Sequence, residues 1–398
     1  MFCPLGGWPA LLALSVPDGN TLRNVWPCSH FGLHVFDRHF LLQQNANTCI
    51  PNIRNNNENS KVNRKVALIG ENGQPAFGLF EQGVERINFQ DYDLRSPMDR
   101  KLGRCAKYFK FNQFQFIALV SPQLIVGVAI VDLKLLSNAF VYLYDPQTQA
   151  FDEFSFVQPL ARHTHIDTQP ESGSASFRSG KNKISIEVKD GRRQLRATLK
   201  SGVTISADID ETDASSLAMC SRAGYQGWVF TRKNAALVCD GSVVWGGKHI
   251  NLAEAKALAS VDWTAGYMRG ETFWNWGSMS ATLSDGRRLG MNLAAGVNET
   301  GFTENALWLD GKLIKVDAVD FQFDRYLPNS PWRMRSADGI VDLVFTPLGQ
   351  RKEKINAVFI ASNFTQHFGV FEGELHIGNE VISIKDCLGF AEDHYARW

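Results

Sequence analysis

The sequence predicts an all-β protein that consists of two antiparallel β-barrels or sandwiches in tandem. The first observation is that two-residue hairpin turns recur after residue 61, between runs of alternating apolar residues. Such turns need positive φ angles, which glycine, asparagine and aspartate tolerate. The turn signals are Asn72-Gly73, Asp190-Gly191, Asp240-Gly241, Asp285-Gly286, Asp310-Gly311, Asp338-Gly339 and Gly378-Asn379.

The second observation is that the segments between these turns are rich in β-branched and aromatic residues, which favour strands. They are FQFIALVS, LIVGVAIVDL, NAFVYLYD, KISIEVKD, RQLRATL, VTISADID, ALWLDGKLIKV, IVDLVFTP and INAVFIAS. The third observation is the length of 398 residues, which exceeds the usual size of one domain. Two closed or sandwiched sheets also avoid the exposed edges that one long open sheet would carry.

One helix is expected, in the segment NLAEAKALAS, where Asn251 is the N-cap and Glu254 completes a capping box. This helix sets the predicted domain boundary. Residues 1–61 carry few charges and end in an Asn-rich stretch, so we expect a poorly ordered leader and linker there. Residues 62–250 then form the first barrel or sandwich, and residues 251–398 form the second.

The charge composition excludes several classes of partner. Forty-one basic and 41 acidic residues leave no net charge, and no long basic run is present, so nucleic acid is not an expected partner. The longest apolar stretch, residues 117–131, is too short to cross a bilayer as a helix. The seven cysteines show no Cys-x-x-Cys spacing, which favours a reducing cytoplasm over a disulfide scaffold.

Neither a cofactor nor a metal is expected. The sequence has no Gly-x-Ser-x-Gly elbow, P-loop, Rossmann fingerprint or His-Glu-x-x-His motif. On a strand, His163, His165 and Asp167 would face one way and could hold iron or zinc. The polar run beside them is more typical of a solvated loop.

Two segments carry the candidate binding residues. In FWNWGSM, Trp274 and Trp276 share one face of a strand, which suits a pocket for a flat or chain-like apolar ligand; ordinary core packing explains the pattern equally well. In TENALWLDG, Glu304 shares a face with Trp308 and needs a partner if it is buried. His367 lies on a polar strand face that is either solvated or the wet end of a pocket.

The chain ends in GFAEDHYARW, which has two interpretations. On a strand, Asp393 and Arg397 share one face and can form an ion-paired structural clasp. Glu392 and His394 share the other face. In a desolvated pocket, a carboxyl group with a raised pKa and an imidazole can move protons.

Six motifs together resemble one family. Their order is FWNWGS, DGRRLGMNL, TENALWLDG, SADGIVDLVFTP, NFTQHFGVFEG and GFAEDHYARW. The sequence from about residue 65 to residue 398 is thereby similar to the bacterial domain-of-unknown-function family DUF2804. This resemblance implies two lipocalin-like (calycin-like) barrels, similar to hydroxyneurosporene-synthase-like proteins, some of which are cofactor-free hydratases or cyclases that handle apolar molecules.

Two functional hypotheses follow, together with a third that is purely architectural. The first is a protein that binds a lipophilic small molecule through Trp274, Trp276, Asn292, Glu304, Trp308 and His367. The alternative is a cofactor-independent hydratase, isomerase or cyclase whose acid and base come from Glu304, His367, Glu392 and His394. The third is a rigid scaffold for a partner protein.

Overall fold

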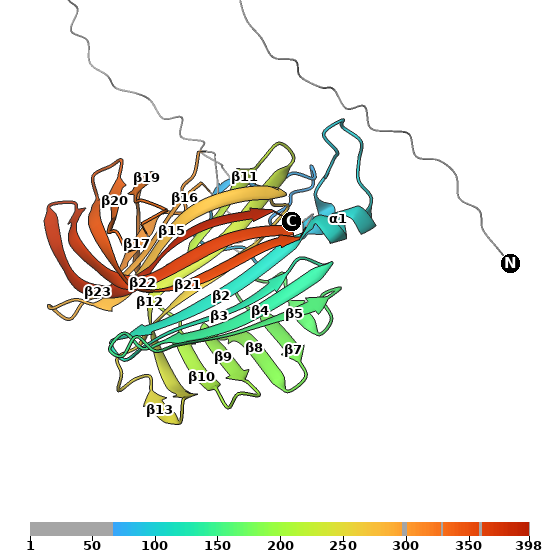
Figure 1. The fold of residues 1–398 in the computed structure, drawn as a ribbon. Coiled ribbons are helices and arrows are strands. Elements are labelled where there is room, and N and C mark those ends of the chain that lie inside the picture. The colour runs from blue at the N-terminus through green and yellow to red at the C-terminus, as the bar shows by residue number, and fades with distance from the viewer. Residues whose placement is uncertain (1–66, 297–300, 328, 358–359, 398) are drawn as a thin grey trace, which may run out of the picture. The chain divides into compact units, whose positions relative to one another are not determined.

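The computed structural model describes residues 67–397, except 297–300, 328 and 358–359 (Figure 1). The predicted leader, residues 1–61, lies outside the described residues. Strands dominate the described part, which has one α-helix, α1 (Arg104–Lys110), and one 3-10 helix, η1 (Phe89–Asp91). No helix in this part of the chain is long and apolar enough to cross a membrane.

The first sheet has 14 antiparallel strands and curls into a nearly closed barrel. Its main path runs in the order β5 (Phe151–Pro159), β4 (Leu136–Tyr144), β3 (Leu124–Asp132), β2 (Asn112–Ser121), β14 (Leu258–Gly266), β12 (Gly227–Trp245), β10 (Thr204–Asp210), β9 (Arg192–Thr198), β8 (Asn182–Lys189), β7 (Ser174–Ser179) and β6 (Thr164–Ile166). Off this path, β12 also pairs with β11 (Leu217–Ala223) and β13 (Lys248–Asn251), and β11 pairs with β1 (Gly78–Leu79).

The second sheet has nine strands and forms a half-barrel. Its order is β18 (Lys312–Lys315), β17 (Ala306–Leu309), β16 (Arg288–Ala295), β15 (Glu271–Thr282), β23 (Glu380–Arg397), β22 (Ile360–Ile377), β21 (Val341–Ala357), β20 (Trp332–Ser336) and β19 (Val319–Gln322). The prediction of an all-β protein with two antiparallel barrel-like sheets is therefore confirmed.

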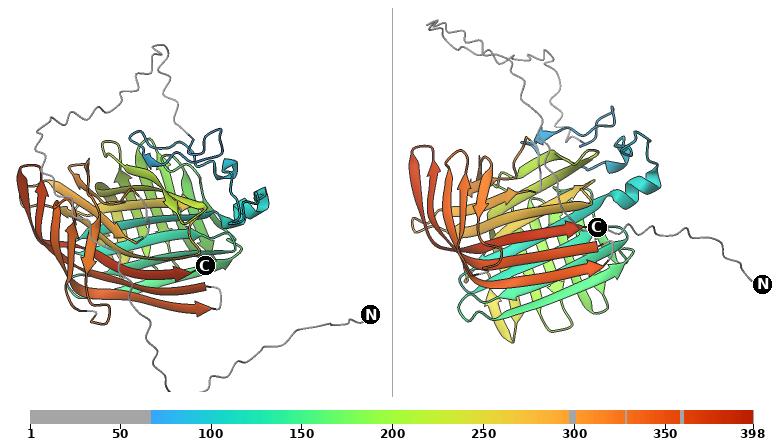
Figure 2. Two further views of the ribbon diagram at one scale, coloured as in Figure 1. Left: turned by 90° about the horizontal axis from the view of Figure 1, so that it is seen from above. Right: turned by 45° about the horizontal axis from the view of Figure 1, so that its top comes forward.

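The two sheets pack against each other through a third apolar cluster, distinct from the core of each. In Figures 1 and 2 the orange to red strands β21–β23 lie alongside the blue-green strands β2–β4. Alternation along β2 sends Ile117 into the first barrel and Phe116 toward the second sheet. The Phe116 ring lies 6.2 Å from that of Phe390, and the Tyr142 ring lies 5.3 Å from that of Phe368.

The predicted helix at residues 251–260 is wrong, because this segment forms a turn between β13 and β14. Asn251 does cap the turn, since its Oδ1 accepts hydrogen bonds from the amides of Ala253 (3.0 Å) and Glu254 (3.1 Å). Lys256 then adopts a φ of 52°, which ends the turn. Leu252 and Ala257 are buried in the core of the first barrel, so packing overrides the helical propensity of the alanines.

The strand after the predicted domain boundary belongs to the first sheet. This strand is β14, which pairs with β2 and β12. The chain therefore passes from the first sheet to the second between Gly266 and Glu271. The division into separate domains at residues 250 and 251 stays a prediction.

Candidate functional site

A row of polar side chains crosses the second sheet on the face that packs against the first. Strand register places Arg351, Gln366, Glu392 and Trp276 directly opposite one another on β21, β22, β23 and β15. Two residues further along, Phe364, His394 and Trp274 form the neighbouring row on the same face. The period-2 pattern predicted from the sequence thus holds for both the tryptophans and the Glu392–His394 pair.

Glu392 is a buried carboxyl group held by neutral donors. Its Oε1 accepts a hydrogen bond from Trp274 Nε1 at 2.7 Å, and its Oε2 accepts one from Gln366 Nε2 at 3.0 Å. Burial raises the pKa of Glu392 to about 7, although both hydrogen bonds and the charge of Arg351 act in the opposite direction. This carboxyl group can therefore gain or lose a proton near neutral pH.

His394 lies beside Glu392 in an aromatic surrounding. Its Nε2 is 3.0 Å from Ser362 Oγ. Its Nδ1 is 3.8 Å from Glu392 Oε1 and has no hydrogen-bond partner among the described residues. The ring packs against Trp274 and Phe364, with centroid distances of 4.2 and 4.9 Å. Burial, and secondarily Arg351, lower the pKa of His394 to about 3, so the imidazole is neutral at pH 7.

Arg351 joins this cluster to the first sheet. Its Nε donates to Glu153 Oε1 on β5 at 2.8 Å, and its Nη2 lies 2.7 Å from the same oxygen. The guanidinium carbon lies 4.1 Å from the centroid of Phe140 and 4.8 Å from that of Phe364. Arg351 thus bridges the two sheets, and its positive charge lowers the pKa of both Glu392 and His394.

A second buried cluster lies on the other side of Trp276. Lys233 Nζ on β12 lies 2.6 Å from Asp262 Oδ2 and 3.1 Å from Glu304 Oε2. Burial alone would lower the pKa of Lys233, but these two carboxylates raise it above the ordinary value. The ammonium group also lies 5.9 Å from the ring of Trp276. We call Lys233, Asp262 and Glu304 the lysine cluster.

Asn292 connects Trp276 to the lysine cluster. Its Oδ1 accepts a hydrogen bond from Trp276 Nε1 at 2.8 Å, and its Nδ2 donates to the Glu304 backbone carbonyl at 2.8 Å. Trp276 and Asn292 therefore help to fix the backbone from which the Glu304 side chain reaches Lys233.

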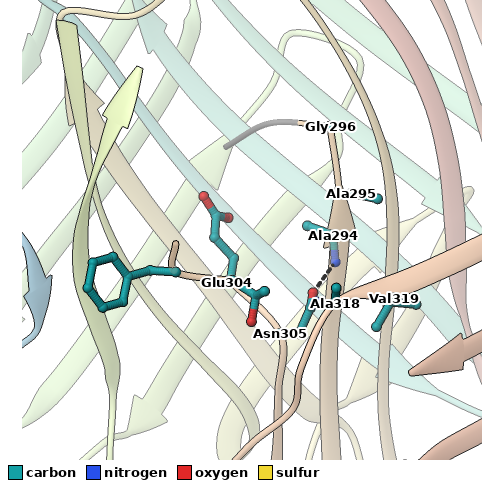
Figure 3. Close-up of a pocket in the computed structure, with 9 residues that line it drawn as sticks. Ala294, Ala295, Gly296, Glu304, Asn305, Ala318 and Val319 are labelled. Atoms are coloured by element: carbon teal, nitrogen blue, oxygen red, sulfur yellow. Dashed lines mark hydrogen bonds between the residues drawn. The ribbon is translucent and has the colours of Figure 1, made fainter. Parts of the chain in front are cut away.

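A cavity of about 180 Å³ lies beside Glu304 (Figure 3). Its walls come from the end of β16, the segment before β17 and the start of β19, and they include Ala294, Ala295, Phe302, Glu304, Asn305 and Val319. A neighbouring cavity of about 290 Å³ shares Phe302 and is lined by Phe77, Arg222 and Gly301. The second cavity lies between residues of the first sheet and residues next to the second sheet.

The structure separates the remaining predicted residues. Trp308 is fully buried in a small core with Leu217, and its Nε1 donates to the Ser215 carbonyl at 2.7 Å. His367 faces the interior of the half-barrel, where its ring lies 5.7 Å from Trp332, and burial lowers its pKa to about 4. Neither residue shares a cluster with Glu392.

The predicted clasp residue Asp393 has a partner that the sequence did not indicate. Arg325 donates to both carboxylate oxygens of Asp393, at 2.5 and 2.9 Å. Asn275 Nδ2 adds a third hydrogen bond at 3.0 Å.

The metal candidates of the sequence lie on and beside β6 of the first sheet. His165 Nε2 lies 2.8 Å from Asp167 Oδ1, and the described residues contain no group of three ligands that could hold a metal ion.

Sequence reasoning missed four residues of the site, Lys233, Asp262, Arg351 and Gln366. A signal exists for two of them: Lys233 lies in WVFTRKNAALV and Asp262 in ALASVDWTAG, and a charge inside an apolar strand needs a partner. The sequence does not identify those partners, because they lie tens of residues away along the chain.

Comparison with solved structures finds barrel proteins. CghA gives a TM-score of 0.50 at 10% identity and covers 83% of this chain and 96% of its own. Kievitone hydratase from Nectria haematococca gives 0.47 at 11% identity, with 72% and 88% covered. A putative AttH from Nitrosomonas europaea gives 0.44 at 15% identity, with 72% and 92% covered. At such identities, the likeness to CghA shows the fold alone.

The sequence itself identifies the family. A search of curated proteins gives no match. Residues 59–398, however, match the family described as a domain of unknown function, DUF2804, as the motif order predicted. This match includes both sheets, the Glu392–His394 pair and the lysine cluster, so the chain belongs to the DUF2804 family.

Proposed function

We propose that this protein binds a small lipophilic molecule in the cavity beside Glu304. The observation that supports this most directly is the cavity itself, about 180 Å³ in volume, with Ala294, Ala295, Phe302 and Val319 among its walls. An apolar cavity of about 150 Å³ is large enough to bind benzene. A ring or a short hydrocarbon chain therefore fits here.

The polar groups around the cavity are held in fixed positions. Asn305 Oδ1 accepts the Ala294 amide at 2.6 Å (dashed line in Figure 3), and its Nδ2 donates to the Asp317 carbonyl at 2.8 Å. Lys233 holds the Glu304 carboxylate from the first sheet. Apolar walls with a few fixed polar groups are typical of small-molecule sites.

Filling the cavity tests this proposal. Ala294→Leu adds apolar volume at the cavity wall, while Ala361→Leu makes the same change at a half-buried alanine on β22 that does not line the cavity. We expect Ala294→Leu to weaken the binding of decan-1-ol at least tenfold in calorimetry and to abolish co-purification of lipophilic compounds, seen by mass spectrometry of organic extracts. Equal binding by both variants and the parent would contradict the proposal.

A second candidate function is acid–base catalysis on an apolar substrate without a cofactor, and the pKa of Glu392, raised to about 7, favours it. In a hydration, protonated Glu392 would donate its proton to a double bond, water would add to the cation formed, and the water's surplus proton would pass to His394 Nδ1. Transfer of that proton from His394 to Glu392 would restore the starting state. The separation of 3.8 Å between Nδ1 and Oε1 is close enough for this return after a small movement.

The two candidates give different results with one variant. Glu392→Gln keeps a hydrogen-bonding side chain but removes the titrating group; Glu374→Gln on the exposed part of β22 is the control. With a compound recovered from the organic extracts as substrate, loss of turnover by Glu392→Gln with unchanged binding would favour the enzyme. Equal turnover by Glu392→Gln and Glu374→Gln would exclude Glu392 as the acid.

A further inference from the structure

The two cavities meet at Phe302, and this shared wall suggests a ligand with two different ends. The Phe302 side chain is 42% exposed and lines both spaces. The Phe302 Cζ atom lies 3.8 Å from the position that a Cβ on Gly78 would occupy. The ring therefore extends from the segment before β17 of the second sheet to strand β1 of the first. A ligand that passes this ring contacts the first cavity with one end and the second cavity with the other.

Arg222 gives the second cavity a positive charge. Its exposed guanidinium carbon lies 4.5 Å above the ring of Phe77, which also lines this cavity. Stacking on an aromatic ring fixes the plane of a guanidinium group and leaves its edge free to bind a carboxylate with two hydrogen bonds.

Arg222 differs from the buried arginines, whose charges are paired with carboxylates. Arg351 pairs with Glu153, and Arg232 pairs with Glu211 and Glu171. Within the residues that the structure describes, no carboxylate forms an ion pair with Arg222. Among the described residues that line the second cavity, Arg222 alone is charged, and the others are Phe77, Gly301 and Phe302.

The first cavity is suited to the opposite end of such a ligand. Its one lining carboxylate, Glu304, is already paired with Lys233, and most of its other walls are alanine, valine and phenylalanine side chains. We propose that the ligand is an amphipathic carboxylate, whose anionic group binds Arg222 and whose hydrocarbon part passes Phe302 into the cavity beside Glu304. This inference rests on the binding function proposed above.

Calorimetry with decanoate and decan-1-ol, both below the concentration at which they aggregate, tests the role of Arg222. Arg222→Gln should weaken decanoate binding about tenfold, because one charge-assisted interaction is lost, and should leave decan-1-ol unchanged. Arg222→Lys should retain part of the preference, and Arg100→Gln, at an exposed arginine outside both cavities, should have no effect. Salt at 0.5 M should weaken only the binding of decanoate.

The outcomes separate the two proposals. If Arg222→Gln leaves decanoate binding unchanged, or weakens both ligands equally, the carboxylate inference is wrong while the binding function stands. If the parent protein binds neither ligand, or Ala294→Leu affects neither, both proposals are wrong. An unchanged urea midpoint for Arg222→Gln will confirm that this exposed substitution leaves the fold intact.

Discussion

Glu304 and Glu392 lie near the same interface between the sheets, but their surroundings differ. Their exposures are nearly equal, at 5% and 6%. Glu304 has the ammonium group of Lys233 at 3.1 Å, whereas Glu392 is bonded by the neutral groups of Trp274 and Gln366. The cations that act on Glu392, Arg351 and Lys233, do so without direct contact.

This difference shows that burial alone does not determine what a carboxyl group does at this interface. A buried carboxylate with an adjacent cation forms an ion pair, and the pair between Glu304 and Lys233 links the two sheets. A buried carboxyl group with only neutral donors keeps its proton up to about pH 7. We therefore interpret the lysine cluster as structural and the Glu392–His394 pair as the group able to exchange protons.

Lys233→Met is the change with the largest expected effect. It leaves Asp262 and Glu304 buried without their shared cation, which should lower the free energy of unfolding by about 3 to 5 kcal/mol. The measurement is urea unfolding at pH 7.5. Arg335→Met, which removes an exposed partner of Asp342, is the control and should cost less than about 1 kcal/mol. Equal effects of the two changes would contradict a structural role for the lysine cluster.

The next prediction concerns Glu392→Gln and pH. Because the folded-state pKa of Glu392, about 7, lies above its ordinary value of 4.5, the folded protein binds this proton more tightly than the unfolded chain. The resulting stabilisation is complete below about pH 4.5 and is lost as pH rises through 7. Relative to the parent, Glu392→Gln should therefore gain about 2 to 3 kcal/mol between pH 5 and pH 8.

The comparison with the parent at each pH isolates Glu392 from the histidines. His394, with a pKa lowered to about 3, acts in the opposite direction and reduces stability as pH falls below about 6.5. Both proteins carry His394, so its contribution cancels to a first approximation. A stability difference that stays constant from pH 5 to pH 8 would mean that Glu392 titrates normally, and the contrast with Glu304 would then be lost.

Local features of this fold, such as its hairpin turns, could be predicted from the sequence. The φ angles are 51° at Asp190 and 74° at Gly191, and 48° at Asp310 and 81° at Gly311. Both pairs thus have the positive φ angles that hairpin turns require. Asp240-Gly241 shows where the same signal is wrong, because it lies inside β12. There Gly241 has a φ of 122°, and a Cβ would lie 2.0 Å from the Ser206 carbonyl oxygen. The glycine is needed for close approach of two strands.

The site was only partly predictable for a different reason. Alternation correctly placed Trp274 with Trp276 and Glu392 with His394, because it depends only on neighbours in the sequence. Pairing Trp274 with His394, and Glu304 with Lys233, requires the strand register and the packing of the two sheets. Those depend on contacts between distant segments, so Trp308 and His367 could not be separated from the site in advance.

The smallest expected effect tests the cause of the unusual protonation at Glu392 and His394. Ser362→Ala removes the hydrogen bond to His394 Nε2, and Nδ1 has no hydrogen-bond partner within the described part of the chain. We therefore expect the free energy of unfolding to fall by about 1 kcal/mol. Ser330→Ala, which removes a hydrogen bond to the Leu327 carbonyl at an exposed site, is the control and should cost less. If burial is the main cause, the NMR titration of His394 will remain far below pH 6.5 in Ser362→Ala and the pH dependence attributed to Glu392 will not change. If either group instead returned to its ordinary pKa, Ser362 would be what excludes water from Glu392 and His394. The difference between Glu392 and Glu304 would then come mainly from exclusion of water, and less from the lack of an adjacent cation at Glu392.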